Sequence, residues 1–161
     1  MTQNFCEKLG LGTVNFGVDY GLTKSAGKVN SEEIKSILQL ANERRVQFID
    51  TASLYGNSEK MLGRFIPKKN SFKIVTKTLF WAGSEISTGF VQDVREAFFQ
   101  SFSLLGVEKI YGLLMHRSAD LLKPGGEMFL EALLHSENIS GDQRDLLKCL
   151  DEFPKSYSLF F

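Results

Sequence analysis

The feature that most constrains this chain is a fourfold alternation of short apolar runs with longer segments of helical period. Each apolar run predicts a strand, and each longer segment repeats apolar residues three and four positions apart, as one face of a helix does. The predicted strands are "KLGLGTV" (8–14), "VQFID" (46–50), "FKIVTK" (72–77) and "IYGLLMH" (110–116). Because strands that alternate with helices pair in parallel, we expect a parallel sheet covered by helices.

The first helical segment has a clear start signal. The sequence "NSEEIKSILQLANERR" (30–45) opens with Asn30 as a candidate cap, and Glu33 follows three residues later. That spacing is typical of a capping box, in which each side chain bonds the backbone N–H of the other residue. The glycine-punctuated residues before it, 15–28, are predicted to form a loop.

Three further helices are expected from the same kinds of signal. A short helix begins at Asn57 or Ser58 and ends near Pro67. A longer one spans "FVQDVREAFFQSFSLLG" (90–106), where Gly106 is suited to end a helix. The last covers "GGEMFLEALLHS" (125–136).

The choice between an open sheet and a barrel depends on where polar residues lie. An open doubly wound sheet usually carries a GxGxxG turn after its first strand, and "GLGTVNFG" (10–17) matches that spacing poorly. Asp50, Lys77 and His116 instead end three different predicted strands. In a (β/α)8 barrel such strand ends ring one mouth. We therefore predict an α/β fold of the TIM-barrel type, of which this chain holds about the first four βα units.

The stretch "FIDTASLYGNSE" (48–59) supplies a chemistry for these residues. A free phenol has a pKa of about 10, so it is a weak proton donor at neutral pH. A neighbouring lysine ammonium lowers the pKa of a phenol, and a carboxylate keeps that lysine charged and in place. Tyr55 as proton donor, Lys77 as its neighbour and Asp50 as the partner of Lys77 meet this demand, and His116 is suited to bind a substrate oxygen.

Such a site protonates the oxygen of a carbonyl substrate while hydride reaches its carbon. No side chain supplies hydride, so a nicotinamide cofactor is required. Each residue taken singly also has a structural interpretation: a helix-capping aspartate, a packed tyrosine, a solvated lysine and a histidine bonded to a loop carbonyl. The catalytic interpretation depends on the four residues acting together.

Four segments in order resemble the signatures of the aldo-keto reductase family. They are "LGLGTVNFG", "FIDTASLYGNSEKMLGRF", "FKIVTKT" and "YGLLMHR", and the resemblance covers roughly 8–134. It implies a TIM barrel, dependence on NADP(H), and a catalytic tetrad carried by Asp50, Tyr55, Lys77 and His116.

The resemblance also implies binding roles for residues outside the tetrad. Gly12 and Thr13 are expected to approach the nicotinamide end of the cofactor beside Asp50. Phe16 and Trp81 are expected to line the substrate mouth together with His116, which would then serve both catalysis and substrate binding.

Composition excludes several other classes of function. The 19 basic residues balance the 19 acidic ones, so net charge recruits neither nucleic acid nor an anionic membrane. Cys6 and Cys149 lie far apart and match no metal-ligand spacing, so we expect reduced thiols and no metal site. Since no run has the length of a signal peptide or a membrane span, the expected location is the cytoplasm.

The end of the chain departs from the family pattern. We interpret 1–134 as the N-terminal half of an aldo-keto reductase barrel and 135–161 as a divergent tail, with one helix around Leu146 to Leu150 and an apolar end, "SYSLFF". A complete barrel takes about 250 residues, so a truncated member is expected.

Three functions remain open at this point. The first is an NADP(H)-dependent carbonyl reductase acting on a small-molecule carbonyl substrate. The second is a catalytically inactive truncated paralogue that lacks the dinucleotide site. The third is a half-barrel module that associates with itself through its open sheet edges.

Overall fold

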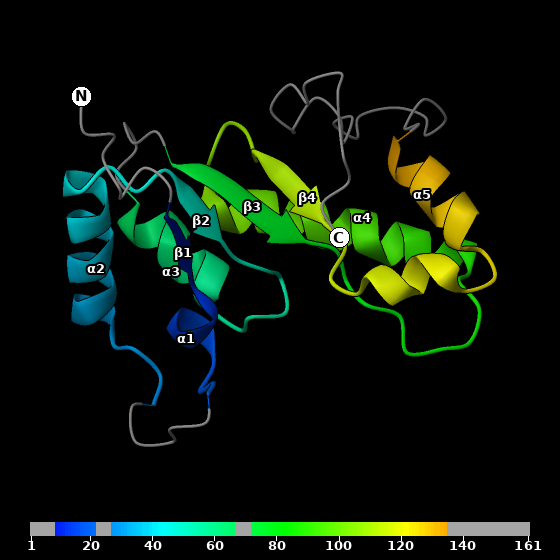
Figure 1. The fold of residues 1–161 in the computed structure, drawn as a ribbon, viewed down its shortest axis with the longest axis horizontal. Helices are drawn as coiled ribbons and strands as arrows, with labels where there is room; N and C mark the ends of the chain where they lie inside the picture. Colours follow the sequence, from blue (N-terminus) through cyan, green and yellow to red (C-terminus); the bar gives the residue numbers. More distant parts are fainter. Residues whose placement is uncertain (1–8, 22–26, 67–71, 135–161) are drawn as a thin grey trace.

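The computed structural model describes residues 9–21, 27–66 and 72–134 (Figure 1). The expected tail at 135–161, both cysteines and Pro67 lie outside these described residues.

A parallel sheet of four strands forms the centre of the described chain. The strands are β1 (Gly10–Gly12), β2 (Phe48–Asp50), β3 (Lys73–Lys77) and β4 (Gly112–Leu114). Each lies within the apolar run that predicted it. The register pairs Gly12 with Asp50 and Lys77 with Leu114, so the strands end close together at one edge.

The strand order is β1-β2-β3-β4, the same as the order along the chain. In an open doubly wound sheet the strand order reverses partway along the chain, as in 3-2-1-4-5-6. In a barrel each new strand is added beside the preceding one. The order therefore confirms an incomplete barrel of the TIM type. Within the described residues, β1 and β4 form the two edges of the sheet.

Four predicted helices are present in the described chain. They are α2 (Ser31–Glu43), α3 (Ser58–Phe65), α4 (Thr88–Leu105) and α5 (Gly126–Leu134). The capping box on α2 is confirmed, because Asn30 Oδ1 accepts the Glu33 N–H at 3.0 Å and Glu33 Oε2 accepts the Asn30 N–H at 3.2 Å. Gly106 ends α4 with a φ of 61°, a left-handed conformation that favours glycine.

Two short elements were not predicted. The helix α1 (Val14–Gly17) begins inside a predicted strand and occupies the start of the segment that was expected to be a loop, and the 3-10 helix η2 (Ser118–Leu122) follows β4. Neither is long enough to show a helical period in the sequence. Tertiary contacts explain α1, since Phe16 is buried in the core and Gly17 packs directly on the backbone of Tyr55.

The hydrophobic core lies between the sheet and the helices. Its members include buried residues from the strands, from α2, α3, α4 and α5, and from the segment before β4: Ile34, Leu38, Ile49, Leu62, Ile74, Val94, Phe98, Leu105, Ile110 and Phe129. In Figure 1, α2 and α5 lie at opposite ends of the molecule, and α3 and α4 lie along the sheet between them. No helix among the described residues is long and apolar enough to cross a membrane.

Burial alternates along β3 and decides where Lys77 points. Ile74 and Thr76 are buried, whereas Lys73, Val75 and Lys77 are half-buried. Successive side chains of a strand point to opposite faces of the sheet. Lys77 therefore lies on the face away from the helix-packed core, which is the inner face of a barrel.

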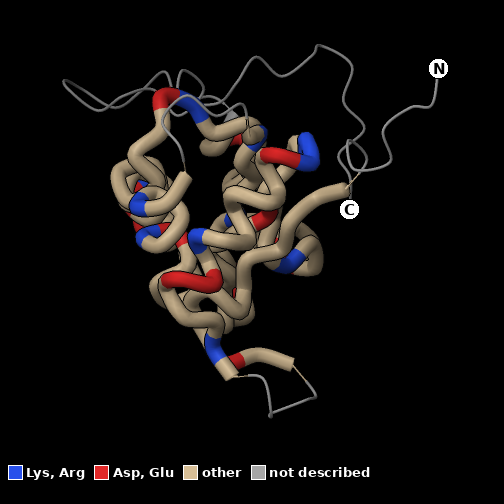
Figure 2. Tube along the Cα trace, turned by 90° about the vertical axis from the view of Figure 1, so that its left-hand side faces the viewer, with Lys and Arg blue, Asp and Glu red and all other residues tan. Residues whose placement is uncertain are grey.

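Charged residues of both signs are distributed along the described trace (Figure 2). Blue and red segments are interspersed along the trace instead of separating into two regions. This mixture of signs along the described trace agrees with the balanced composition.

Candidate active site

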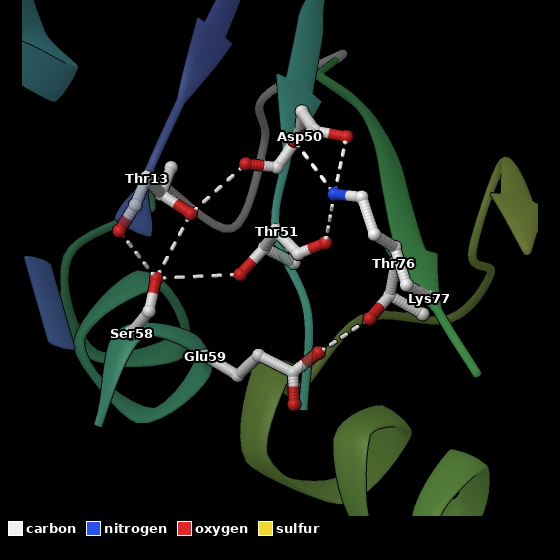
Figure 3. Close-up of polar contacts among 7 residues, drawn as sticks. All are labelled: Thr13, Asp50, Thr51, Ser58, Glu59, Thr76 and Lys77. Atoms are coloured by element: carbon white, nitrogen blue, oxygen red, sulfur yellow. Dashed lines mark hydrogen bonds and ion pairs between the residues drawn. The ribbon is translucent and has the colours of Figure 1, made fainter. Parts of the chain in front are cut away.

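An ion pair joins the ends of β2 and β3. Lys77 Nζ lies 2.8 Å from Asp50 Oδ1 and 2.7 Å from Asp50 Oδ2, and it donates a third hydrogen bond to the carbonyl oxygen of Thr51 at 3.0 Å (Figure 3). An ammonium group has three protons, and these three contacts use all of them. The lysine is therefore held in one position at the mouth of the sheet.

Tyr55 lies on the turn that connects β2 to α3. Its backbone N–H donates to the carbonyl of Ala52 at 3.0 Å, and its own carbonyl accepts the N–H of Ser58 at 3.1 Å. The half-buried ring has its centroid 5.0 Å from Lys77 Nζ. The turn thus presents the phenol beside the fixed ammonium group.

His116 follows β4 and faces the same mouth. Its ring lies edge-on to Tyr55, with the centroids 6.3 Å apart, and 5.7 Å from the ring of Phe80. Its backbone N–H donates to Thr78 Oγ1 at 3.2 Å, and its buried Nδ1 has no hydrogen-bond partner within the described residues.

Burial, followed by the positive charges of Lys77 and Arg117, lowers the pKa of His116 from its ordinary value of 6.5, while Asp120 and Asp50 raise it in part. The imidazole is accordingly neutral at neutral pH. A neutral imidazole carries one N–H donor and one acceptor nitrogen, so it can hydrogen-bond a substrate oxygen without protonating it.

The structure brings the four residues of the expected tetrad to one mouth. Asp50, Lys77 and His116 come from three neighbouring strand ends, and Tyr55 comes from the turn after β2.

The three expected binding residues that lie at or just after the end of β1 have different environments. Gly12 is exposed at the end of β1, and a Cβ added there would meet nothing within 4 Å. Thr13 is buried, and its amide and hydroxyl both donate to the carbonyl of Asp50, at 3.1 and 3.0 Å. Phe16 is 3% exposed and packs in the core. The cofactor contacts of Gly12 and Thr13 and the substrate contact of Phe16 stay predictions.

Hydrogen bonds hold both the backbone N–H and the backbone carbonyl of Trp81. Its N–H donates to Asp120 Oδ2 at 2.9 Å, and its carbonyl accepts from Lys123 Nζ at 2.6 Å. Asp120 and Lys123 also pair with each other at 2.7 Å. Burial raises the pKa of Asp120, but its bonds to Lys123 and to the Trp81 N–H outweigh burial and hold that pKa below its ordinary value. The sequence predicts neither partner, because η2, which carries Asp120, is too short to show a helical period.

Four buried polar residues beneath the mouth were also missed. They are Thr51, Ser58, Glu59 and Thr76 (Figure 3). Ser58 and Glu59 belong to the "YGNSE" motif, where Ser58 was considered only as a helix start. Both side chains are buried, which points to a role beyond starting the helix. The sequence does not show this burial, because it arises only when the chain folds.

Groups of three or more histidine, cysteine, aspartate or glutamate residues that could hold a metal ion are absent from the described ranges. The expectation of no metal site therefore stays a prediction for the whole chain.

Comparison with known proteins decides the family. The model of the Aldo/keto reductase family matches residues 8–156. The chain belongs to the aldo/keto reductase family. The match continues past Leu134, into residues that lie outside the described structure.

Solved structures of aldo-keto reductases resemble the same part of the chain. A putative aldo-keto reductase from Pseudomonas aeruginosa is 30% identical, with a TM-score of 0.58, over 77% of this chain and 49% of its own. The holo form of an aldo-keto reductase from Bacillus halodurans is 19% identical and shares the fold, with a TM-score of 0.53 over 78% of this chain and 40% of its own. This aldo/keto reductase chain thus spans about half the length of these proteins. Among curated proteins, no sequence matches it significantly.

Proposed function

We propose that this chain carries the catalytic half of an NADP(H)-dependent carbonyl reductase, with Tyr55 as the proton donor. The observation that carries the proposal is the placement of Lys77, which is bonded to both oxygens of Asp50 and lies 5.0 Å from the ring of Tyr55. A positive charge beside a phenol favours the phenolate that remains after the proton has been donated.

The residues at the strand ends fit a nicotinamide cofactor. Gly12 leaves open space at the end of β1 directly beside Asp50, its partner in the register. A side chain there would fill that space, so a glycine suits a flat ring approaching the backbone. When bound, NADPH supplies the hydride that no side chain provides.

The reaction assigns one task to each residue. Tyr55 donates the proton that the carbonyl oxygen needs as its carbon is reduced, and Lys77 stabilises the resulting phenolate. Asp50 holds Lys77 in place through both of its carboxylate oxygens. His116, neutral because its pKa is lowered, hydrogen-bonds the substrate oxygen and orients the carbonyl toward Tyr55.

A cofactor titration tests the proposal first. NADPH is added to the purified 161-residue chain while its fluorescence is followed, and the mass of the protein in solution is measured on the same sample. Binding in the micromolar range supports the reductase. Absence of binding at millimolar cofactor contradicts it and favours the inactive paralogue, which shares the tetrad but lacks the dinucleotide site.

A tyrosine substitution tests the role of the proton donor. Tyr55→Phe removes the phenolic proton and is expected to abolish carbonyl reduction while NADPH binding remains. Tyr20→Phe is the matched control, because Tyr20 is 66% exposed and carries no proposed role. Loss of cofactor binding in Tyr55→Phe, or unchanged reduction, would contradict the assignment.

Self-association is the second candidate function, and the described sheet favours it. The strands β1 and β4 present unpaired backbone groups at the sheet edges within the described residues. We propose that a second copy pairs with these edges. A monomeric mass across the concentration range of the titration would contradict self-association. A dimer that binds NADPH would support both candidate functions, with the dimer as the cofactor-binding form. The cytoplasmic location stays a prediction.

A further inference from the structure

Two consecutive polar residues at the start of α3 are buried without a task in the proposed chemistry. Ser58 is 0% exposed and Glu59 is 2% exposed. Burying a polar side chain costs free energy unless it is hydrogen-bonded. The bonds that these two residues make show what they hold together.

Ser58 joins the ends of β1 and β2. Its Oγ lies 2.9 Å from both the carbonyl oxygen and the Oγ1 of Thr13, and 3.3 Å from Thr51 Oγ1 (Figure 3). A serine hydroxyl has one proton. Because that proton goes to Thr13, the hydroxyl of Ser58 accepts at its contact with Thr51. Replacing Ser58 with alanine would remove the contact to Thr51 Oγ1 and one of the contacts to Thr13 Oγ1, and both threonines are fully buried.

The contacts of Ser58 lead to both members of the ion pair. The hydroxyl of Thr13 donates to the carbonyl of Asp50 at 3.0 Å, and the carbonyl of Thr51 accepts from Lys77 Nζ at 3.0 Å. One hydroxyl group thus fixes the backbone that carries Asp50 and the backbone oxygen that holds Lys77.

Glu59 joins α3 to β3 and α4. Its Oε1 accepts the hydroxyl proton of Thr76 at 2.7 Å, and Ser101 from α4 hydrogen-bonds the same carboxyl group. Thr76 directly precedes Lys77 in β3. Burial raises the pKa of Glu59 despite these two bonds, so this carboxyl group bears a desolvation cost.

We infer that Ser58 and Glu59 are positioning residues that set where Tyr55 lies relative to Lys77. The first turn of α3 is fastened to the ends of β1, β2 and β3, and the carbonyl of Tyr55 accepts the N–H of Ser58. The phenol therefore follows α3, while the ammonium group follows the strands to which α3 is fastened. The inference deepens the proposed function and rests on it for its catalytic consequence, but the geometry is testable without activity.

Burial lowers the pKa of His116 most, and the charge of Lys77 lowers it further, so this pKa responds to the position of Lys77. The charged groups that act on His116 are Lys77, Arg117, Asp120 and Asp50, and the first two lower its pKa. If Lys77 moves away from the mouth, the pKa of His116 rises toward 6.5. The chain has two histidines, so proton NMR follows both through a pH titration, and His116→Gln assigns the signal. Lys77→Met gives the full size of the effect.

Paired variants separate the hydrogen bonds from general loss of structure. Thr76→Val keeps the shape of the side chain and removes the bond to Glu59, whereas Thr76→Ser keeps the hydroxyl. Ser58→Ala removes the link to Thr13, and Ser36→Ala removes an exposed serine hydroxyl bonded to Glu32 in α2. We expect the pKa of His116 to rise in Thr76→Val and Ser58→Ala, by less than it rises in Lys77→Met. In the controls Thr76→Ser and Ser36→Ala we expect this pKa to stay unchanged.

Activity provides a second measurement. In the same two variants kcat is expected to fall about 10-fold to 100-fold, with KM changed less than about twofold, because a misplaced donor slows the chemical step more than binding. If the wild type has no activity, the proposed function fails while the titration still tests the positioning role. An unchanged pKa of His116 in Thr76→Val and Ser58→Ala would overturn the inference. An unchanged pKa in Lys77→Met would also overturn it, because the inference requires Lys77 to be held beside His116.

Discussion

Lys77 and Asp50 form a two-oxygen ion pair across neighbouring strand ends, with Lys77 Nζ at 2.7 and 2.8 Å from the two carboxylate oxygens. The side chain of Lys77 is 15% exposed and that of Asp50 is 45% exposed. A pair with one partner this exposed contributes little to stability. The ion pair instead holds the ammonium group of Lys77 in one place. Losing the pair should therefore affect activity more than folding stability.

The substitution Asp50→Asn tests this separation. The amide keeps the shape of the carboxylate but loses its charge, so Lys77 is no longer fixed by two strong acceptors. We expect the free energy of unfolding to fall by at most about 1 kcal/mol and kcat to fall at least about tenfold. Denaturant unfolding and steady-state kinetics on one preparation measure both. A large loss of stability with unchanged kcat would contradict the proposed role.

The lowered pKa of His116 gives stability a defined pH dependence. Burial, Lys77 and Arg117 place this pKa below 6.5 in the folded state, whereas the unfolded chain titrates near 6.5. The unfolded state therefore binds the proton first, and stability is lost as the pH falls from 6.5 through the folded value. Unfolding in denaturant at a series of pH values measures the effect. His116→Gln should remove this part of the dependence, and a variant that retains it would assign the dependence to other groups.

Two glycines at the start of the chain differ in what an added methyl group would meet. A Cβ at Gly17 would overlap the backbone carbonyl of Tyr55, whereas a Cβ at Gly12 has open space. We expect Gly17→Ala to lower the free energy of unfolding by about 1 to 3 kcal/mol and to displace Tyr55. Gly12→Ala should fold like the wild type and weaken NADPH binding. Thermal unfolding and the cofactor titration distinguish the two, and equal stabilities would show that α1 does not pack on Tyr55 as described.

The ion pair of Asp120 and Lys123, which bonds the backbone N–H and carbonyl of Trp81, is expected to hold the segment that carries Trp81. Asp120→Ala leaves the N–H of Trp81 and the ammonium of Lys123 without this acceptor, at a cost of about 1 to 3 kcal/mol. Because the chain has a single tryptophan, its fluorescence reports the change, and the emission should shift to longer wavelength as the ring becomes more exposed. Ser118→Ala, which alters an exposed residue two positions before Asp120, is the control. Unchanged emission in Asp120→Ala would show that other contacts hold Trp81.

Much of the fold followed from local patterns in the sequence. Asn30 and Glu33 predicted the capping box because its hydrogen bonds lie within one helical turn. Gly106 predicted the end of α4 because a left-handed residue favours glycine wherever it occurs. The polar residues that end β2 and β3 predicted a shared mouth, since parallel strands bring their carboxyl ends to one edge.

The residues that the sequence did not reveal depend on contacts between distant segments. The resemblance predicts a cofactor contact for Thr13, and the structure adds that its buried hydroxyl donates to the carbonyl of Asp50, 37 residues away. The sequence predicts Ser58 as a helix start, and the structure shows that it also links the residues that follow β1 and β2. Asp120 lies in a helix of five residues, too short to produce a periodic signal.

The sequence by itself determined the order of the four strands and the four longer helices, the incomplete barrel they form and the identity of the four polar residues at its mouth, because these depend on periodicity and on residue type. The tertiary structure alone decided how those residues are held: three acceptors around Lys77, a lowered pKa at His116, and buried hydroxyl and carboxyl groups beneath the mouth. Hydrogen bonds and desolvation arise where distant segments meet, and no local pattern records those distances.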